Sequence, residues 1–304
     1  MTSAIRQPGA LMSGLVLRTT PPRAPRHQLL RPRLGIDAEV FRERPVMVVQ
    51  APAGFGKTSL LGQWRREHLA RGAAVAWMSA DDHEDPHHFL HALTLAVRTG
   101  RGRPAFGRYS LAGGGAPGGE LEGITAWLAE VAQTSLDMVL IVDEVERLPA
   151  RNFATLIYLL HNLPPNLRVI IAGRGELDDA VADLIVYGAG VAIGPETLRF
   201  SLDETIAFVR NRFCGNVDTD ACARLHEITE GWPLGLQLAL AATEGTGDPR
   251  AAINGMLARN EGRSEQLVGG LLDNLAAGDT DFLVRVSLVE LLHPDLCRAL
   301  LDRA

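Results

Sequence analysis

Eight residues near the start of the chain have the composition and spacing of a phosphate-binding loop. They read Ala51-Pro52-Ala53-Gly54-Phe55-Gly56-Lys57-Thr58, with alanine in the first glycine position of the pattern. Successive backbone N–H groups of such a loop form a concave anion site, and the positive end of the helix that follows strengthens it. Gly54 and Gly56 allow the positive φ angles and close approach that this path requires. The loop therefore predicts binding of a nucleoside triphosphate, with ATP as the expected nucleotide.

Lys57 and Thr58 are the side chains of this loop that could contact the phosphates and their metal ion. Lys57 is the only lysine in the chain, and the other 29 of its 30 basic residues are arginine. A compact ammonium fits against a phosphate loop where a forked guanidinium does not. We expect Lys57 to bridge the β- and γ-phosphates and the Thr58 hydroxyl to bind Mg²⁺. Ser59 is expected to line the same nucleotide site.

Two acidic residues, Asp143 and Glu144, follow the apolar run at residues 138–142. Ligands of open parallel sheets bind at the carboxyl ends of the strands, so both carboxylates are expected near the phosphate loop. Asp143 is predicted to hold Mg²⁺, mainly through water. Glu144 is predicted to orient or deprotonate the attacking water, and a solvated acid at a strand end is the alternative.

Arg174 follows the apolar run at residues 169–172 and Gly173. A cation at the end of that strand could sense the γ-phosphate of a bound nucleotide. From position alone, an arginine of a surface loop is an equal alternative.

A second motif, His83-Glu84-Asp85-Pro86-His87, matches the zinc-protease pattern and is rejected. That chemistry needs both histidines on one face of one helix. Pro86 lacks an N–H group and would clash with the carbonyl of Asp82 in a continuous helix. We therefore expect a helix that begins at Pro86, capped by Asp85, and no zinc site.

Short apolar runs alternate with helical patterns up to Pro195. Strands are predicted at residues 46–50, 74–79, 138–142, 167–172 and 191–193. Strands that alternate with helices indicate an α/β fold in which helices cover both faces of a mostly parallel sheet. The chain then becomes all-helical, with helices predicted at residues 202–213, 219–230, 234–242, 250–259, 265–275 and 280–291.

Charge and cysteine content narrow the class of protein. The net charge is −6, but residues 1–36 hold six arginines and no acid, which leaves 24 basic and 36 acidic side chains in the rest. An acidic body argues against DNA binding by this chain alone. Three widely spaced cysteines favour a reducing cytoplasm. No apolar run reaches the roughly 18 residues of a membrane helix, so no membrane partner is expected.

Several segments resemble the MalT-like, LuxR-type large ATP-binding regulators of the STAND class of signalling NTPases. The phosphate loop is similar to the family version. So are Leu60-Leu61-x-x-Trp64, Val75-Ala76-Trp77, Asp85-Pro86-x-x-Phe89, Leu163-Pro164-Pro165-Asn166-Leu167-Arg168, Leu198-Arg199-Phe200-Ser201 and Glu230-Gly231-Trp232-Pro233-Leu234-Gly235-Leu236-Gln237-Leu238-Ala239. The resemblance covers most of residues 29–304. Each motif is weak alone, and together they are specific.

The resemblance implies a domain order and further site roles. It implies a basic flexible arm at 1–34, a P-loop nucleotide-binding domain at 35–195, a helical lid at 196–245 and the start of a winged-helix-like domain at 246–304. Arg174 matches the family's sensor arginine, and Pro233 is expected near the adenine. The family shows Asp-Asp where this chain has Asp143-Glu144, which leaves the hydrolysis rate open.

The favoured function is a switch module that binds ATP or ADP with Mg²⁺ and acts as a slow ATPase within a transcriptional regulator. Self-association in the ATP state is left open. A metabolic P-loop kinase that passes phosphate to a small acceptor is the alternative from another class. A scaffold that uses nucleotide only to fold is the third.

Overall fold

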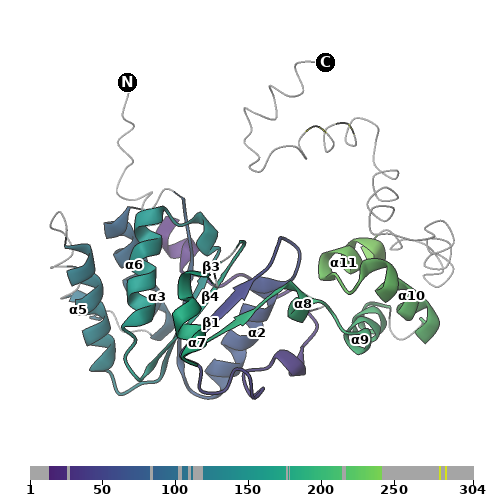
Figure 1. The fold of residues 1–304 in the computed structure, drawn as a ribbon, viewed down its shortest axis with the longest axis horizontal. Coiled ribbons are helices and arrows are strands. Elements are labelled where there is room, and N and C mark those ends of the chain that lie inside the picture. Colours follow the sequence, from purple (N-terminus) through teal and green to yellow (C-terminus); the bar gives the residue numbers. More distant parts are fainter. Residues whose placement is uncertain are drawn as a thin grey trace. The chain divides into compact units, whose positions relative to one another are not determined.

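The computed structural model describes residues 14–25, 28–82, 85–101, 105–108, 111, 119–175, 177, 179–213, 217–241, 281 and 285. The chain divides into two compact units, Met1–Leu198 and Arg199–Ala304 (Figure 1). The predicted division into four parts stays a prediction.

The first unit is built on a five-stranded parallel sheet with strand order β2-β3-β4-β1-β5. The strands are β1 (Val46–Gln50), β2 (Ala74–Ser79), β3 (Met138–Asp143), β4 (Leu167–Gly173) and β5 (Gly190–Ile193). All five strands predicted from the sequence are confirmed, with ends that shift by at most one residue. Because every pairing is parallel, all five carboxyl ends lie at one edge of the sheet and all five amino ends at the other.

Helices cover both faces of this sheet, as the apolar strands require. They are α2 (Lys57–Ala70), α3 (Pro86–Arg101), α5 (Glu120–Ala132), α6 (Ala150–His161), α7 (Ala182–Val186) and α8 (Pro195–Leu198). In Figure 1, α3, α5 and α6 stand on one side of the sheet and α2 stands on the other. Short 3-10 helices lie at Pro32–Leu34 (η1), Val145–Arg147 (η2) and Asp179–Val181 (η3). The sequence analysis did not anticipate α7, α8 or the 3-10 helices.

Alternate side chains of a strand reach opposite faces, and this fills two separate cores. Val46 and Val48 of β1 pack in the cluster that also contains Trp127 of α5. Met47 and Val49, between and after them, pack in the other cluster with Trp64 of α2. Both tryptophans are fully buried. The sheet is thus held from both sides, which fixes the strand ends that carry functional side chains.

The start of α3 confirms the predicted helix beginning at Pro86 and its cap at Asp85. The helix begins at Pro86, and the Asp85 carboxylate accepts the backbone N–H of His88 at 2.8 Å. His83 and Glu84 lie outside the described residues. The absence of zinc at this motif stays a prediction.

The segment before β1 is fastened to α2. The side-chain amide of Gln63 accepts from the backbone N–H of Arg31 at 2.9 Å and donates to its carbonyl at 3.1 Å. The Trp64 indole donates to the carbonyl of Leu34 at 2.6 Å. The buried guanidinium of Arg31 donates to the carbonyl of Leu198 at 2.9 Å. Residues 31–34 therefore join α2 to the last residue of the first unit.

The described part of the arginine-rich arm also contacts the first unit. Leu15 is buried in the cluster that contains Trp127. Arg18 donates to the carbonyl of Ser79 at 3.0 Å and lies 3.7 Å from the carboxylate of Asp81. The stretch at residues 15–18 is therefore held against the domain, within the arm predicted to be flexible.

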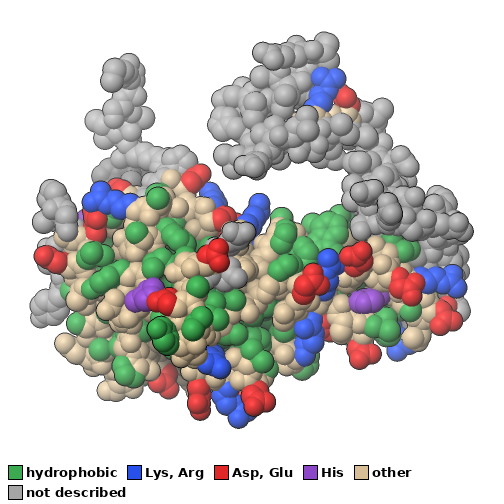
Figure 2. Space-filling model, viewed as in Figure 1, with side chains coloured by type: hydrophobic (Ala, Val, Ile, Leu, Met, Phe, Trp, Pro, Cys, Tyr) green, Lys and Arg blue, Asp and Glu red, His purple; other side chains and the backbone are tan. Residues whose placement is uncertain are grey.

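The described surface mixes charges of both signs. In Figure 2, acidic and basic side chains lie scattered among one another on the visible face of each unit. Among the described residues, no helix is both long enough and apolar enough to cross a bilayer.

The described part of the second unit is helical, as predicted. It contains α9 (Leu202–Arg212), α10 (Thr219–Thr229) and α11 (Pro233–Ala241). Ser201 and Glu204 form a reciprocal capping box at the start of α9, and Asp218 caps α10 through the N–H of Ala221 at 2.7 Å. The helices predicted at 250–259, 265–275 and 280–291, and the start of a winged-helix-like domain, lie outside the described residues except for helical Asp281 and Arg285.

Candidate nucleotide-binding site

The phosphate loop connects the carboxyl end of β1 to the start of α2. Gly54 and Gly56 both have a φ of 80°, in the left-handed region that favours glycine. A Cβ atom at Gly56 would meet nothing within 4 Å, so the backbone angle and not crowding requires glycine there. Gly56 is also the N-cap of α2, and no side chain caps this helix end. The first N–H groups of α2 are therefore left for a ligand, and the helix dipole favours an anion.

The ammonium group of Lys57 is held by the loop itself. It donates to the carbonyls of Ala51 at 2.6 Å and of Pro52 at 3.0 Å. Burial lowers the pKa of Lys57, Glu146 opposes this shift, and Arg174 adds to it. Two of the three ammonium donors are thus satisfied by carbonyls, which fixes the cation beside the loop.

Thr58 and Asp143, the two predicted Mg²⁺ ligands, lie side by side. The Thr58 hydroxyl donates to Oδ2 of Asp143 at 2.7 Å, although 85 residues separate them in the chain. Asp143 is the last residue of β3 and is only 3% exposed. Burial raises its pKa, while the bonds from Thr58 and from the N–H of Glu144 lower it. A hydroxyl and a carboxylate at hydrogen-bond distance form a hard-oxygen pair that fits Mg²⁺.

Glu144 leaves the strand with a strained backbone. Its φ is 58°, an uncommon value for a residue other than glycine. Its carboxylate lies 3.4 Å from the guanidinium of Arg147, and the side chain is 44% exposed. Strained residues of this kind concentrate at functional sites. Glu144 directly follows Asp143, which bonds to Thr58, and its carboxylate contacts the guanidinium of Arg147.

Arg174 is tied to a carboxylate that the sequence analysis did not select, Glu146. The backbone N–H of Arg174 donates to Oε2 of Glu146 at 3.1 Å, and its Nε lies 3.4 Å from Oε1. The adjoining Gly173 lies close to this carboxylate, because a Cβ atom there would be 2.8 Å from Oε2 of Glu146 and would make the side chain shift. The run of three acids in Asp143-Glu144-Val145-Glu146 was the available signal for this residue.

Pro233 lies in the second unit, at the first position of α11. Before it, Glu230 and Gly231 have φ angles of 49° and 69°, which end α10. A Cβ atom at Gly231 would lie 2.3 Å from the carbonyl of Phe200, so only glycine fits. This confirms the predicted helix punctuation, in which glycine ends one helix and proline opens the next. The role of Pro233 at the adenine stays a prediction.

Sequence comparison agrees with this geometry. Residues 41–181 match the family described as AAA domain. The chain is 26% identical over 282 residues to the HTH-type transcriptional regulator MalT of Vibrio campbellii, a match that covers 90% of this chain and 30% of that protein. The chain is homologous to the N-terminal portion of MalT-type regulators. The P-loop NTPase fold of this MalT-like chain is thereby confirmed, as is the predicted resemblance.

Another relative is named as a protein kinase. The serine/threonine-protein kinase PknK of Mycobacterium tuberculosis is 28% identical to this chain over 262 residues, which cover 84% of this chain and 23% of PknK. The chain thus spans less than a third of the length of these curated relatives. Among solved structures, CDC6P from Pyrobaculum aerophilum is 14% identical with a TM-score of 0.40, over 86% of this chain and 79% of that one.

Proposed function

We propose that this chain is the nucleotide-dependent switch module of a MalT-like regulator. In this proposal it binds ATP with Mg²⁺ at residues 51–59, hydrolyses the nucleotide slowly, and differs in conformation between its ATP and ADP states. The observation that carries the proposal is the meeting of Lys57, Thr58 and Asp143 at the carboxyl edge of the sheet. These are the three side-chain types that recognise a Mg²⁺–triphosphate.

Each residue has a defined part in nucleotide binding. The N–H groups from Gly54 to Ser59 surround the phosphates, and the Lys57 ammonium turns from the carbonyls of Ala51 and Pro52 toward the β- and γ-phosphates. Thr58 and Asp143 hold Mg²⁺, Asp143 mainly through water. Mg²⁺, when bound, neutralises charge that develops on the phosphate oxygens during transfer.

Hydrolysis requires one positioned water and one cation at the γ-phosphate. Glu144 orients that water and accepts its proton as the oxygen attacks phosphorus, and the bond to the β-phosphate oxygen breaks to leave ADP and inorganic phosphate. Arg174 reaches the γ-phosphate once it leaves Glu146, its contact in the described structure. Two groups that must first change partners, Lys57 and Arg174, are consistent with slow turnover.

A binding assay tests the core of this proposal. Lys57→Ala is expected to weaken ATP binding at least about a hundredfold in isothermal titration calorimetry, since the charge-assisted contacts to two phosphates are lost. Lys57→Arg is expected to fail as well, because the forked guanidinium does not fit. Arg66→Ala, an exposed residue of the same helix that contacts Gln28, is the matched control and should bind normally. Equal ATP affinity in Lys57→Ala and the parent would refute the site.

Product analysis separates the switch from the metabolic kinase. The switch releases ADP and phosphate at the same slow rate with or without small acceptors. A kinase would show transfer to one of them, and a scaffold would release no ADP. The rate of ADP release across an acceptor panel therefore decides among the three.

Control of transcription belongs to the proposal for the full-length protein. The support is similarity to regulators of that description, of which this chain spans less than a third. Promoter DNA would be contacted by other parts of such a protein, and self-association in the ATP state would link nucleotide to output. A few kcal/mol between the two states is enough for a switch of this kind. Gel filtration with ATP and with ADP tests the assembly step.

A further inference from the structure

A pocket lies at the amino edge of the sheet, opposite the edge that carries the phosphate loop. Its volume is about 840 Å³, within the range of small-molecule sites. Val46, Met138 and Leu167, which begin β1, β3 and β4, contribute to its wall. The phosphate loop follows the opposite ends of these strands, so the two sites are separated by the length of the sheet.

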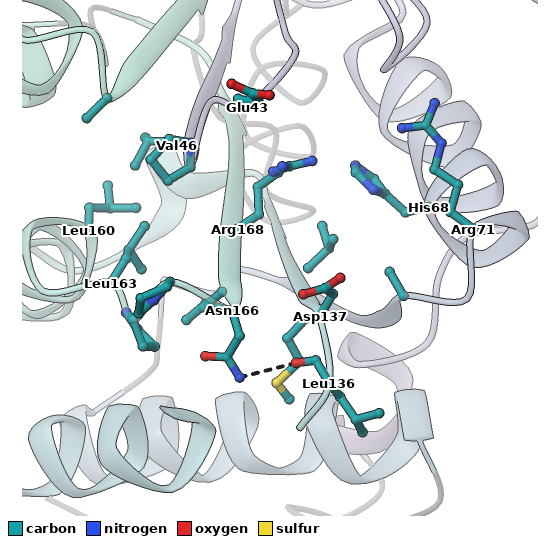
Figure 3. A pocket seen from close by; sticks show the side chains of 18 of the residues that line it. Glu43, Val46, His68, Arg71, Leu136, Asp137, Leu160, Leu163, Asn166 and Arg168 are labelled. Carbon is teal, nitrogen blue, oxygen red and sulfur yellow. Dashed lines mark hydrogen bonds between the residues drawn. The ribbon is translucent and has the colours of Figure 1, made fainter. Parts of the chain in front are cut away.

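Three polar side chains converge in this pocket from distant parts of the chain. Figure 3 shows the imidazole of His68, the guanidinium of Arg168 and the carboxylate of Asp137 pointing toward one another across the open space. They come from the end of α2, the start of β4 and the loop before β3. None of them belongs to the nucleotide site.

His68 is the least exposed of the three, and one nitrogen of its ring lacks a hydrogen-bond partner among the described residues. It is 3% exposed, and its Nε2 makes no hydrogen bond within the described part of the chain. Burial, with Arg168 and Arg71 adding to it, lowers the pKa of His68 to about 4, so the ring is neutral at pH 7. A buried polar atom without a partner costs about 1–3 kcal/mol, which a ligand bonded to Nε2 would recover.

The charged groups beside His68 are near one another without being paired. Arg168 is half-buried, and the charges of Asp137 and Glu43 raise its pKa against the lowering by burial. Yet none of the described ion pairs within 4 Å involves Arg168, Asp137 or Glu43. Arg71 is paired with Asp37 instead. One cation and two carboxylates therefore line the pocket without an ion pair within 4 Å among the described residues.

The opposite side of the pocket carries apolar side chains beside the polar His161 and Asn166. Val46, Leu160 and Leu163 lie across from the polar groups in Figure 3. A ligand that fits both walls carries an acidic group, a cationic donor and a hydrocarbon part. A simple anion would leave the carboxylates unmatched, and a nucleotide would place its phosphates against them.

We propose that this pocket binds a small amphipathic zwitterion, namely an α-amino acid with an apolar side chain or a short peptide of such residues. Its carboxylate pairs with Arg168 and accepts a hydrogen bond from His68 in the tautomer that carries its proton on Nε2. Its ammonium lies between Asp137 and Glu43, and its side chain packs on Val46, Leu160 and Leu163. This site is separate from nucleotide binding and does not depend on it.

Calorimetry with a matched ligand set tests the proposal without any nucleotide. The full chain is titrated with leucine, isoleucine, valine, methionine, phenylalanine and the dipeptide Leu-Leu. Isocaproate, which lacks the ammonium of leucine, and isopentylamine, which lacks its carboxylate, are the single-charge arms. At least one zwitterion should bind at least about tenfold more tightly than either arm, since each arm leaves one charged wall unpaired. The dipeptide arm separates a free amino acid from a peptide as the source.

Variants locate the binding. Arg168→Gln and Asp137→Asn are each expected to weaken the zwitterion about tenfold, and Asp137 is exposed enough that its variant keeps the fold. Arg151→Gln, which removes an arginine of α6 paired with Glu120 on the surface, is the control and should bind like the parent. ATP affinity, measured in parallel, reports that the domain is intact. Failure of every zwitterion to bind, isocaproate binding as tight as leucine, or no effect of Arg168→Gln and Asp137→Asn would each overturn the proposal.

Discussion

The two edges of the sheet differ in whether their charged side chains are already bonded to other protein groups. At the carboxyl edge the key groups are tied together, with Lys57 on loop carbonyls, Thr58 on Asp143, and Arg174 on Glu146. At the amino edge none of the ion pairs within 4 Å among the described residues involves Arg168 or Asp137, and Nε2 of His68 is buried without a hydrogen-bond partner there. The first edge must exchange internal contacts for a ligand, whereas the second has none to give up. A site that must break its own ion pairs before it binds a ligand suits a slow switch. A site without such pairs suits simple binding.

An Asp→Asn substitution at each edge is expected to give the largest difference in Mg²⁺–ATP affinity. Asp143→Asn removes a carboxylate proposed for Mg²⁺ and is expected to abolish the Mg²⁺-dependent part of ATP affinity, on the order of tenfold to a hundredfold. Asp137→Asn should leave Mg²⁺–ATP binding unchanged. Titrations of ATP with Mg²⁺ and with chelator measure both. If Asp137→Asn weakened Mg²⁺–ATP as much as Asp143→Asn does, the two edges would not be independent.

Within the carboxyl edge, Glu144 is expected to matter for turnover and not for affinity. Glu144→Gln keeps the size of the side chain but removes the base, so ATP turnover should fall roughly a hundredfold while ATP binding is preserved. Phosphate release and calorimetry measure the two quantities. Glu120→Gln, a surface acid paired with Arg151, serves as the control. Unchanged turnover in Glu144→Gln would mean that this acid is merely solvated.

Strand β4 reaches both edges, and a methyl group at its carboxyl end should disturb only one of them. In Gly173→Ala the new Cβ would approach Glu146 and Val145 at 2.8 Å, so stability should fall by about 1–3 kcal/mol. Gly62→Ala in α2, where a Cβ meets nothing within 4 Å, should raise stability by about 0.5–1 kcal/mol. Urea unfolding compares the two. Leucine binding at Arg168 should persist in folded Gly173→Ala protein.

DNA binding gives the smallest expected effect, since neither edge offers a basic surface. The chain after residue 36 has 24 basic and 36 acidic side chains, so no sequence-specific promoter binding is expected at physiological salt. Any weak binding should come from the arm, fall steeply with salt and vanish when Arg6, Arg23 and Arg26 are changed to glutamine. Fluorescence anisotropy across a salt series measures this. A salt-tolerant footprint in that triple variant would contradict the expectation.

The features that depend on local sequence patterns could be predicted from the sequence. The strands were predictable from apolar runs, and the phosphate loop from glycine spacing beside one lysine. The Glu146–Arg174 contact was not, because it depends on how η2 sits against the end of β4. Nor was the amino-edge pocket, whose His68, Asp137 and Arg168 lie far apart in the chain and meet only through strand order. Parallel topology creates such sites without leaving a motif.

The fastening of residues 31–34 has a mechanical consequence. The phosphate loop continues directly into α2, and the hydrogen bonds from Gln63 and Trp64 to Arg31 and Leu34 lie about 9 Å farther along that helix, at 1.5 Å per residue from Thr58 to Trp64. Arg31 in turn holds the carbonyl of Leu198, the point where the chain leaves the first unit. A shift of α2 would therefore move residues 31–34 and, through Arg31, the carbonyl of Leu198.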